Sequence, residues 1–205
     1  MEINASIVRE LRDKTGAGVM DCKKALAEAG GDLEKAIVWL RERGIAQAAK
    51  RLGKLASDGS VGAYIHAGGK LGVLVEVNCE TDFVAKTPEF RALVKEIAMQ
   101  IAAANPRCVS REDVPTDVIE QERQIYATQS AGKPEAVVKK IVDGKLEKFF
   151  RDICLNEQAW VRDPNRTITD LLGEYVAKLG EKIEIRRFVR FQLGESRDGN
   201  MAADA

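Results

Sequence analysis

Apolar residues near the start of the chain recur every three or four positions, which predicts three short helices. Glycine-containing turns separate these helices, because glycine ends a helix more readily than it continues one. Asp32 is placed to cap the third helix, and Gly44 is placed to end it. We therefore expect a helical domain over residues 1–45, followed by a separate, basic linker helix over residues 46–57.

After this linker the apolar period changes from helical spacing to strict alternation, which predicts strands. Val61, Ala63 and Ile65 alternate towards a Gly-Gly turn, and the chain alternates back from Leu71, so a hairpin is expected. A third strand is expected over residues 183–193. The alternation does not give the order of the three strands in the sheet.

Helices are expected between the hairpin and the third strand, each bounded by residues that start or stop helices. Five helices are expected: one from Pro88 to Asn105, one that starts at Thr116, one from Pro134 to Gly144, one from Leu146 to Ile153, and one from Thr169 to Gly180. The layout is α+β, with a small antiparallel sheet packed with helices over residues 58–194. The polar tail over residues 195–205 is expected to be flexible.

The most unusual local pattern lies where the second hairpin strand ends. There the alternating apolar residues give way to a polar corner that presents Asp82 and Phe83 side by side. An exposed Phe forgoes about 1.5–3 kcal/mol of burial, so such a tip suggests insertion into another molecule. The alternative is that Phe83 is a buried anchor under the helix that starts after Pro88.

Composition excludes several classes of function. Among the 205 residues, Lys and Arg together number 32 and so do Asp and Glu, which argues against direct nucleic-acid binding. The start of the chain lacks the pattern of a signal peptide, and no apolar run approaches the length of a membrane span. The four cysteines are scattered without metal-ligand spacing, as expected for packed free thiols in a reducing cytosol.

No motif predicts a site for bond-making chemistry. His66 stands on a predicted strand without a partner at catalytic or ligand spacing. The glycine-rich segments 16–18 and 68–72 join helices or close a hairpin, whereas a phosphate loop needs a strand before it and a helix after it. We therefore predict a binding protein without a cofactor or metal rather than an enzyme.

Two segments resemble the signatures of one protein family. Residues 11–26, LRDKTGAGVMDCKKAL, look like the amino-terminal signature of bacterial translation elongation factor Ts. Residues 76–85, EVNCETDFVA, resemble its second signature nearly residue for residue. Residues 132–149 and 185–191 are also similar, so the resemblance covers nearly the whole chain in the same order.

The resemblance implies a guanine-nucleotide exchange factor for elongation factor Tu, acting in protein synthesis in the cytoplasm. It implies that the helical domain is ubiquitin-associated-like (UBA-like) and docks on the partner's nucleotide-binding domain. It further implies that a short tip inserts beside the partner's magnesium site, dislocates Mg²⁺ and promotes GDP release so that GTP can bind. The tip residues are Thr81, Asp82, Phe83 and Val84.

The resemblance also implies docking contacts for the partner in its GDP-bound and nucleotide-free forms, carried by Arg12, Met20 and Lys23. For Met20, packing inside the helical domain's own core is an equal alternative. The chain resembles the short family form with one core lobe, whose members pair as homodimers. Phe188, Phe191 and the final strand are then candidates for the dimer interface, because an unpaired edge strand invites pairing.

Two other functions remain open at this stage. The chain could be a non-catalytic UBA-type adaptor that tethers a protein through residues 1–45. It could also be an enzyme that acts on a small phosphorylated ligand through its glycine turns.

Overall fold

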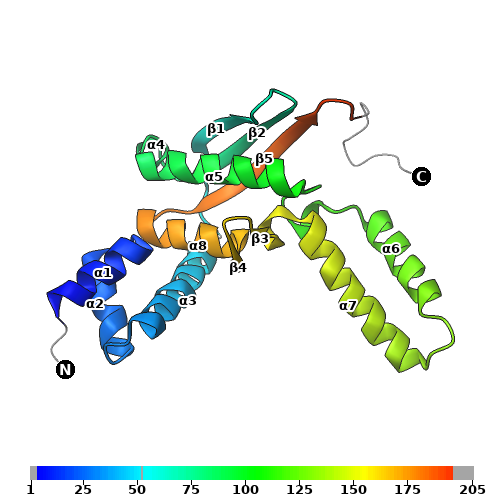
Figure 1. Cartoon of the computed structure of the whole chain (residues 1–205), viewed down its shortest axis with the longest axis horizontal. Coiled ribbons are helices and arrows are strands. Elements are labelled where there is room, and N and C mark those ends of the chain that lie inside the picture. The colour runs from blue at the N-terminus through cyan, green and yellow to red at the C-terminus, as the bar shows by residue number, and fades with distance from the viewer. Residues whose placement is uncertain (1–3, 52, 196–205) are drawn as a thin grey trace. The chain divides into compact units, whose positions relative to one another are not determined.

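The computed structural model describes residues 4–51 and 53–195, and it confirms the α+β fold (Figure 1). All but the first residue of the predicted tail, 195–205, lies outside the described residues. The chain forms two compact units. Unit 1 consists of the described residues up to Val61, Glu76–Val94 and Thr169–Ile185, and unit 2 consists of Gly62–Val75, Lys95–Ile168 and the described residues from Arg186 onward.

The predicted three-helix head is present in unit 1. It consists of α1 (Ala5–Thr15), α2 (Val19–Glu28) and α3 (Leu33–Arg51), with a break after α1 at Gly16. Asp32 caps α3 as predicted, since its carboxylate accepts a hydrogen bond of 3.0 Å from the backbone N–H of Lys35. The helices enclose a small apolar core made of Val8, Leu11, Cys22, Ala25, Leu26 and Ala36.

The predicted helix end at Gly44 is wrong, because α3 continues without a break to Arg51. The separate helix expected over 46–57 is therefore the end of α3, and residues 53–57 are not helical. Gly44 has a packing role: a Cβ there would lie 2.9 Å from the backbone oxygen of Gly173 on α8 (Ile168–Leu179). One turn earlier, Arg41 on α3 forms an ion pair with the nearly buried Asp170 of α8. Close helix packing, not termination, explains this glycine.

The three predicted strands form one sheet in the order β1-β2-β5 (Figure 1). They are β1 (Asp58–Ile65), β2 (Leu71–Cys79) and β5 (Ile183–Gln192). The alternating valines of β2 (Val73, Val75 and Val77) are buried, whereas Val61 and Ile65 of β1 are mostly exposed. The apolar alternation in β1 therefore marks a sheet face that the described residues leave exposed.

The remaining helices differ from the sequence expectations mainly at their ends. They are α4 (Asp82–Ala85), α5 (Pro88–Ala104), α6 (Thr116–Gln129) and α7 (Glu135–Ile153), with short 3₁₀ turns at Arg111–Asp113 and Leu155–Glu157. Helix α6 begins at Thr116 as expected, with Pro115 in the N-cap position, and α8 begins at Ile168, one residue before the expected start at Thr169. The expected break at Gly144 is wrong because α7 runs through it, where a Cβ would meet open space. The short strand pair β3 (Ala159–Trp160) and β4 (Asp163–Thr167) was not predicted.

In unit 2, α6 and α7 pack side by side as a helical hairpin (Figure 1). Val142, Leu146 and Phe150 of α7 supply its buried apolar face. Arg111 stacks over the Phe150 ring at 4.5 Å and pairs with Glu147 of α7 and with Glu157. This cluster fixes the end of the hairpin to the turns that flank it.

Candidate functional site

The tip residues form a single helical turn rather than an open loop. Thr81 has extended backbone angles and caps α4, its hydroxyl oxygen accepting a hydrogen bond of 3.4 Å from the N–H of Val84. Ala85 at the end of the turn is buried and anchors it. The threonine cap and the buried alanine favour this turn, but α4 is too short to be stable on its own.

Phe83 extends from this turn into solvent and is 82% exposed. The alternative of a buried anchor is therefore wrong for Phe83. That role belongs to Phe90 in the first turns of α5, which is fully buried. In the described structure Phe83 is the largest exposed apolar side chain of unit 1, which is the arrangement expected of a residue that another molecule covers.

Asp82 lies next to Phe83, and its carboxylate forms an ion pair with Lys86 one turn later. Both side chains of this pair are at least half exposed. Pairs of this kind contribute little to stability, about 0.3–0.5 kcal/mol, and they exchange readily for other partners. The Asp82 carboxylate is therefore available to a binding partner at small cost.

The base of the tip is held by two glutamates from neighbouring segments of unit 1. The carboxylate of Glu181 accepts hydrogen bonds from the backbone N–H groups of Glu80 and Thr81, at 3.1 and 3.0 Å, and from the Thr81 hydroxyl at 2.6 Å. In return, Glu80 accepts from the backbone N–H of Lys182 and from the guanidinium of Arg51, both at 2.6 Å. We call this reciprocal arrangement the tip clasp.

The surroundings of Glu80 favour its charged form. The pKa of its carboxyl group is held below the ordinary value, first by the hydrogen bond from the Lys182 backbone N–H and then by Arg51. The residue therefore carries its charge at any pH near neutrality.

The three head residues singled out from the sequence lie on the surface of unit 1. Met20 is 75% exposed, so the alternative that it packs in the head core is wrong. Met20 and Lys23 stand one turn apart on α2, which places them on the same side of the helix. Arg12 lies on α1 and is also exposed. Val19 and Val38 are further exposed apolar residues of the head that the sequence did not single out.

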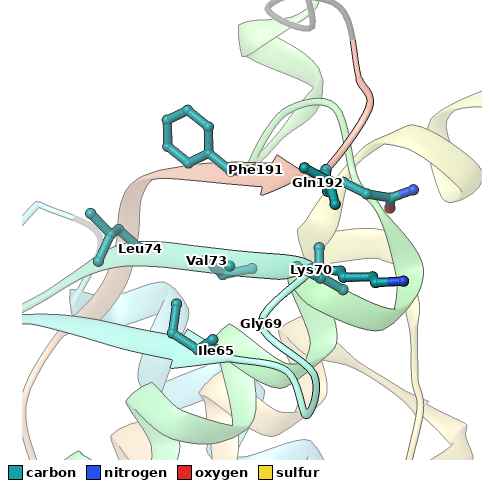
Figure 2. Close-up of a pocket in the computed structure, with 10 residues that line it drawn as sticks. Ile65, Gly69, Lys70, Val73, Leu74, Phe191 and Gln192 are labelled. Atoms are coloured by element: carbon teal, nitrogen blue, oxygen red, sulfur yellow. The ribbon is translucent and has the colours of Figure 1, made fainter.

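Unit 2 carries a second exposed apolar region, an open groove on the sheet (Figure 2). Figure 2 shows Ile65, Leu74 and Phe191 on three neighbouring strands, with Lys70 and Gln192 at one end. Ile65, Leu74 and Phe191 are 66%, 46% and 68% exposed. Because β5 is an edge strand of this sheet, the groove continues to an edge where a further strand could pair.

The other residues considered from the sequence as catalytic or metal-ligating do not come together in a site within the described residues. His66 is exposed, and its Nδ1 lies 2.9 Å from the Tyr64 hydroxyl. The residues that the structure describes contain no group of three or more metal-ligating side chains placed to hold an ion. None of the helices in the described ranges is long and apolar enough to cross a membrane.

The four thiols are free and buried, as the sequence predicted. Burial raises the pKa of each thiol, that of Cys79 to about 11. Cys108 and Cys154 lie with their sulfur atoms 3.6 Å apart in the core of unit 2.

Sequence reasoning missed Glu181 and Arg51, which hold the tip in place. Glu181 lies 101 positions from Glu80 in the chain, and no local pattern distinguishes it from a solvated acid. The one sequence signal is its place directly after Gly180, which ends α8 in a left-handed conformation with φ of 74°. Long-range contacts of this kind are visible only once the fold is known.

Comparison with known proteins gives one consistent result. A family model described as elongation factor TS matches residues 17–195. Elongation factor Ts of Thermoanaerobacter sp. strain X514 is 63% identical over 195 residues, covering 94% of this chain and 96% of that protein. The proteins of the same name from Desulforamulus reducens and Anaeromyxobacter sp. strain K are 57% and 61% identical over 196 residues, each covering 95% of this chain.

Proposed function

The chain belongs to the elongation factor Ts family and so has a role in translation elongation, and from this premise we propose that it releases GDP from elongation factor Tu. The observation that carries the proposal is the exposed Phe83 on a capped turn beside Asp82. In this proposal Thr81, Asp82, Phe83 and Val84 are the residues that disturb the partner's magnesium and phosphate site. The chain is then an exchange factor of the cytoplasm and not an enzyme.

The proposed mechanism is a wedge. GDP is held in such partners by a phosphate cradle and by Mg²⁺, so a shift of the surrounding helices weakens the nucleotide. Phe83 would favour the opened arrangement by burying its ring there. Asp82 would break its ion pair with Lys86 and bring a negative charge close to the ligands of the metal. The charge would perturb these ligands, and Asp82 would not become a stable ligand itself.

Phe83 alone cannot supply the binding energy needed to weaken GDP binding. Thermodynamic linkage means that if this chain weakens GDP binding, GDP weakens binding of the chain by the same factor. A factor of about 10⁴ needs about 5.5 kcal/mol of differential binding, whereas burying one Phe supplies about 1.5–3 kcal/mol. Other surfaces of the chain must contribute the remainder.

We assign the docking contribution to the head, residues 1–45, which we propose to be a UBA-like module. Arg12, Met20 and Lys23 offer an exposed thioether side chain beside two positive charges. Methionine adapts its shape to a partner, and it is common on protein-binding surfaces. This surface would bind elongation factor Tu in both its GDP-bound and nucleotide-free forms, while the tip discriminates between them.

We also propose that two copies of the chain pair through the sheet groove and the β5 edge. Phe191 would be buried in such a dimer, and the half-buried Phe188 lies on the same strand. Light scattering at micromolar concentration tests this proposal, which predicts twice the mass of one chain. The mass of a single chain would contradict it.

Release of labelled GDP from elongation factor Tu tests the exchange function. The intact chain should accelerate release, and Phe83→Ala and Asp82→Ala should each reduce the acceleration. If the intact chain binds without accelerating release, it is a UBA-type adaptor and the exchange function is wrong. If both variants retain full acceleration, exchange stands and the wedge mechanism is wrong.

A further inference from the structure

We propose that Glu181 is a positioning residue for the tip: through the tip clasp its carboxylate holds Thr81 so that α4 presents Phe83 in one orientation. This inference rests on the proposed exchange function and assigns a role within it to a residue that lies outside both family signatures. The clasp consists entirely of residues of unit 1.

The Glu181 carboxylate accepts more hydrogen bonds from the protein than a solvated surface acid does. Two backbone N–H groups and one hydroxyl converge on its two oxygen atoms. The 2.6 Å bond from the Thr81 hydroxyl lies in the range of charge-assisted O–H···O⁻ bonds, which are about twice as strong as neutral ones. Without Glu181, the N–H groups of Glu80 and Thr81 would lose these acceptors.

The direction of the Thr81 hydroxyl links Glu181 to the helical turn. A hydroxyl has one proton to donate and two lone pairs to accept with. Because Thr81 donates its proton to Glu181, its lone pairs remain for the N–H of Val84, the bond that caps α4. Glu181 therefore sets the rotamer that the cap requires.

The hydrogen bonds that Glu80 accepts connect the tip to the end of α3. Glu80 accepts from Lys182 and from Arg51, the last residue of α3. The Lys182 ammonium in turn donates to the backbone oxygen of Lys54, at 3.1 Å. Arg51 and Lys54 are thus hydrogen-bonded to Glu80 and Lys182, which belong to the two segments that hold the start of α4.

Such a base matters more for exchange than for folding. A four-residue turn has too few internal hydrogen bonds to hold one conformation by itself. A wedge that is ordered before binding does not spend binding energy on ordering, so more of that energy is available to shift the partner. Loss of the clasp should therefore lower the maximal rate of GDP release more than it weakens docking.

The test is the release of fluorescently labelled GDP from elongation factor Tu, measured over a range of concentrations of the intact chain. For Glu181→Ala we expect the maximal rate to fall about tenfold, while the half-saturating concentration changes less than about threefold. Glu181→Gln, which keeps one acceptor oxygen, should restore part of the rate. Glu89→Gln removes a carboxylate of unit 1 in the first turn of α5, outside the tip clasp, and it should behave as the unmodified chain.

Two further readouts separate positioning from a general loss of structure. Amide hydrogen exchange of Glu80 and Thr81 should become faster in Glu181→Ala, while that of the head core remains unchanged. In the double variant with Phe83→Ala, the maximal rate should equal that of Phe83→Ala alone within about twofold, because Glu181 acts through Phe83. If Glu181→Ala does not fold, Thr81→Val and Glu181→Gln provide the same comparison.

The outcomes are distinct. Faster amide exchange at Thr81 with an unchanged maximal rate would overturn the positioning role and leave the exchange function intact. Full additivity of the two substitutions would overturn it as well. If the unmodified chain fails to release GDP, the proposed function itself is wrong, and the role of Glu181 falls with it.

Discussion

Phe83 and Phe90 are the same residue type seven positions apart, yet their surroundings are opposite. Phe90 is fully buried in α5, whereas Phe83 is 82% exposed on α4. The residues just before Phe83 are held by carboxylates and a hydroxyl, whereas Phe90 begins a buried apolar face of α5 that continues with Leu93 and Val94. The chain thus uses one aromatic ring to hold the fold, and it uses a polar framework to present the other. This difference separates the residues on which stability depends from those on which the proposed exchange function depends.

The largest expected effect is on the buried ring. Phe90→Ala should lower the free energy of unfolding by about 3–5 kcal/mol, because it removes apolar contacts and leaves a cavity. Phe83→Ala should change that free energy by less than about 0.5 kcal/mol, because its ring has little burial to lose. Urea unfolding followed by circular dichroism measures both. Equal destabilisation by the two substitutions would mean that Phe83 supports the fold as much as Phe90 does.

A smaller effect should distinguish two glycines that lie inside long helices. Gly44→Ala should destabilise the chain by about 1–3 kcal/mol, because its Cβ would lie 2.9 Å from the backbone oxygen of Gly173. Gly144→Ala should stabilise it by about 0.5–1 kcal/mol, because open space surrounds that position and alanine favours helix. Thermal unfolding of the two variants should shift in opposite directions. A shift in the same direction would show that Gly44 does not pack closely against α8.

The reactivity of the four cysteine thiols tests whether the core around them is closed to solvent. All four thiols are buried and their pKa values are raised, so the reactive thiolate is scarce at neutral pH. A chromogenic disulfide reagent should react slowly with the native chain and quickly in denaturant. Rapid reaction of one native thiol would place that cysteine at the surface. Reaction rates in the Phe90→Ala variant should rise as its core opens.

The smallest expected effect concerns the polar framework under Phe83. The pKa of Glu80 is lower in the folded chain, so its contribution to stability is present above the unfolded value of about 4.3 and is lost as pH falls through the folded value. The amide shift of Lys182 in an NMR titration should therefore change with a midpoint below about 4.3. In Glu80→Gln this titration should disappear. A midpoint above the unfolded value would contradict the hydrogen bond from Lys182 to Glu80.

The sequence alone predicted the elements of the fold well and their spatial relations poorly. The head helices, the hairpin and the final strand follow from apolar spacing, which local geometry imposes. The sequence predicts helix ends at both Gly44 and Gly144, because glycine disfavours helix locally. At Gly44, close packing against α8 outweighs that local preference. The strand order could not be predicted, since it depends on contacts between distant segments.

The candidate site shows the same division. Thr81 to Val84 could be singled out because an acid and an aromatic at the end of a strand are unusual in any context. The choice between a buried and an exposed Phe83 needed the structure, because burial depends on what packs above the turn. Glu181 gave no usable signal, since its partners lie about a hundred residues away in the chain.

We propose that Phe83 serves exchange and not folding, and the decisive measurement is GDP release at a saturating concentration of Phe83→Ala. The maximal release rate should be at least about tenfold below that of the unmodified chain, the equivalent of losing roughly 1.4 kcal/mol of differential binding. A maximal rate equal to that of the unmodified chain would contradict it.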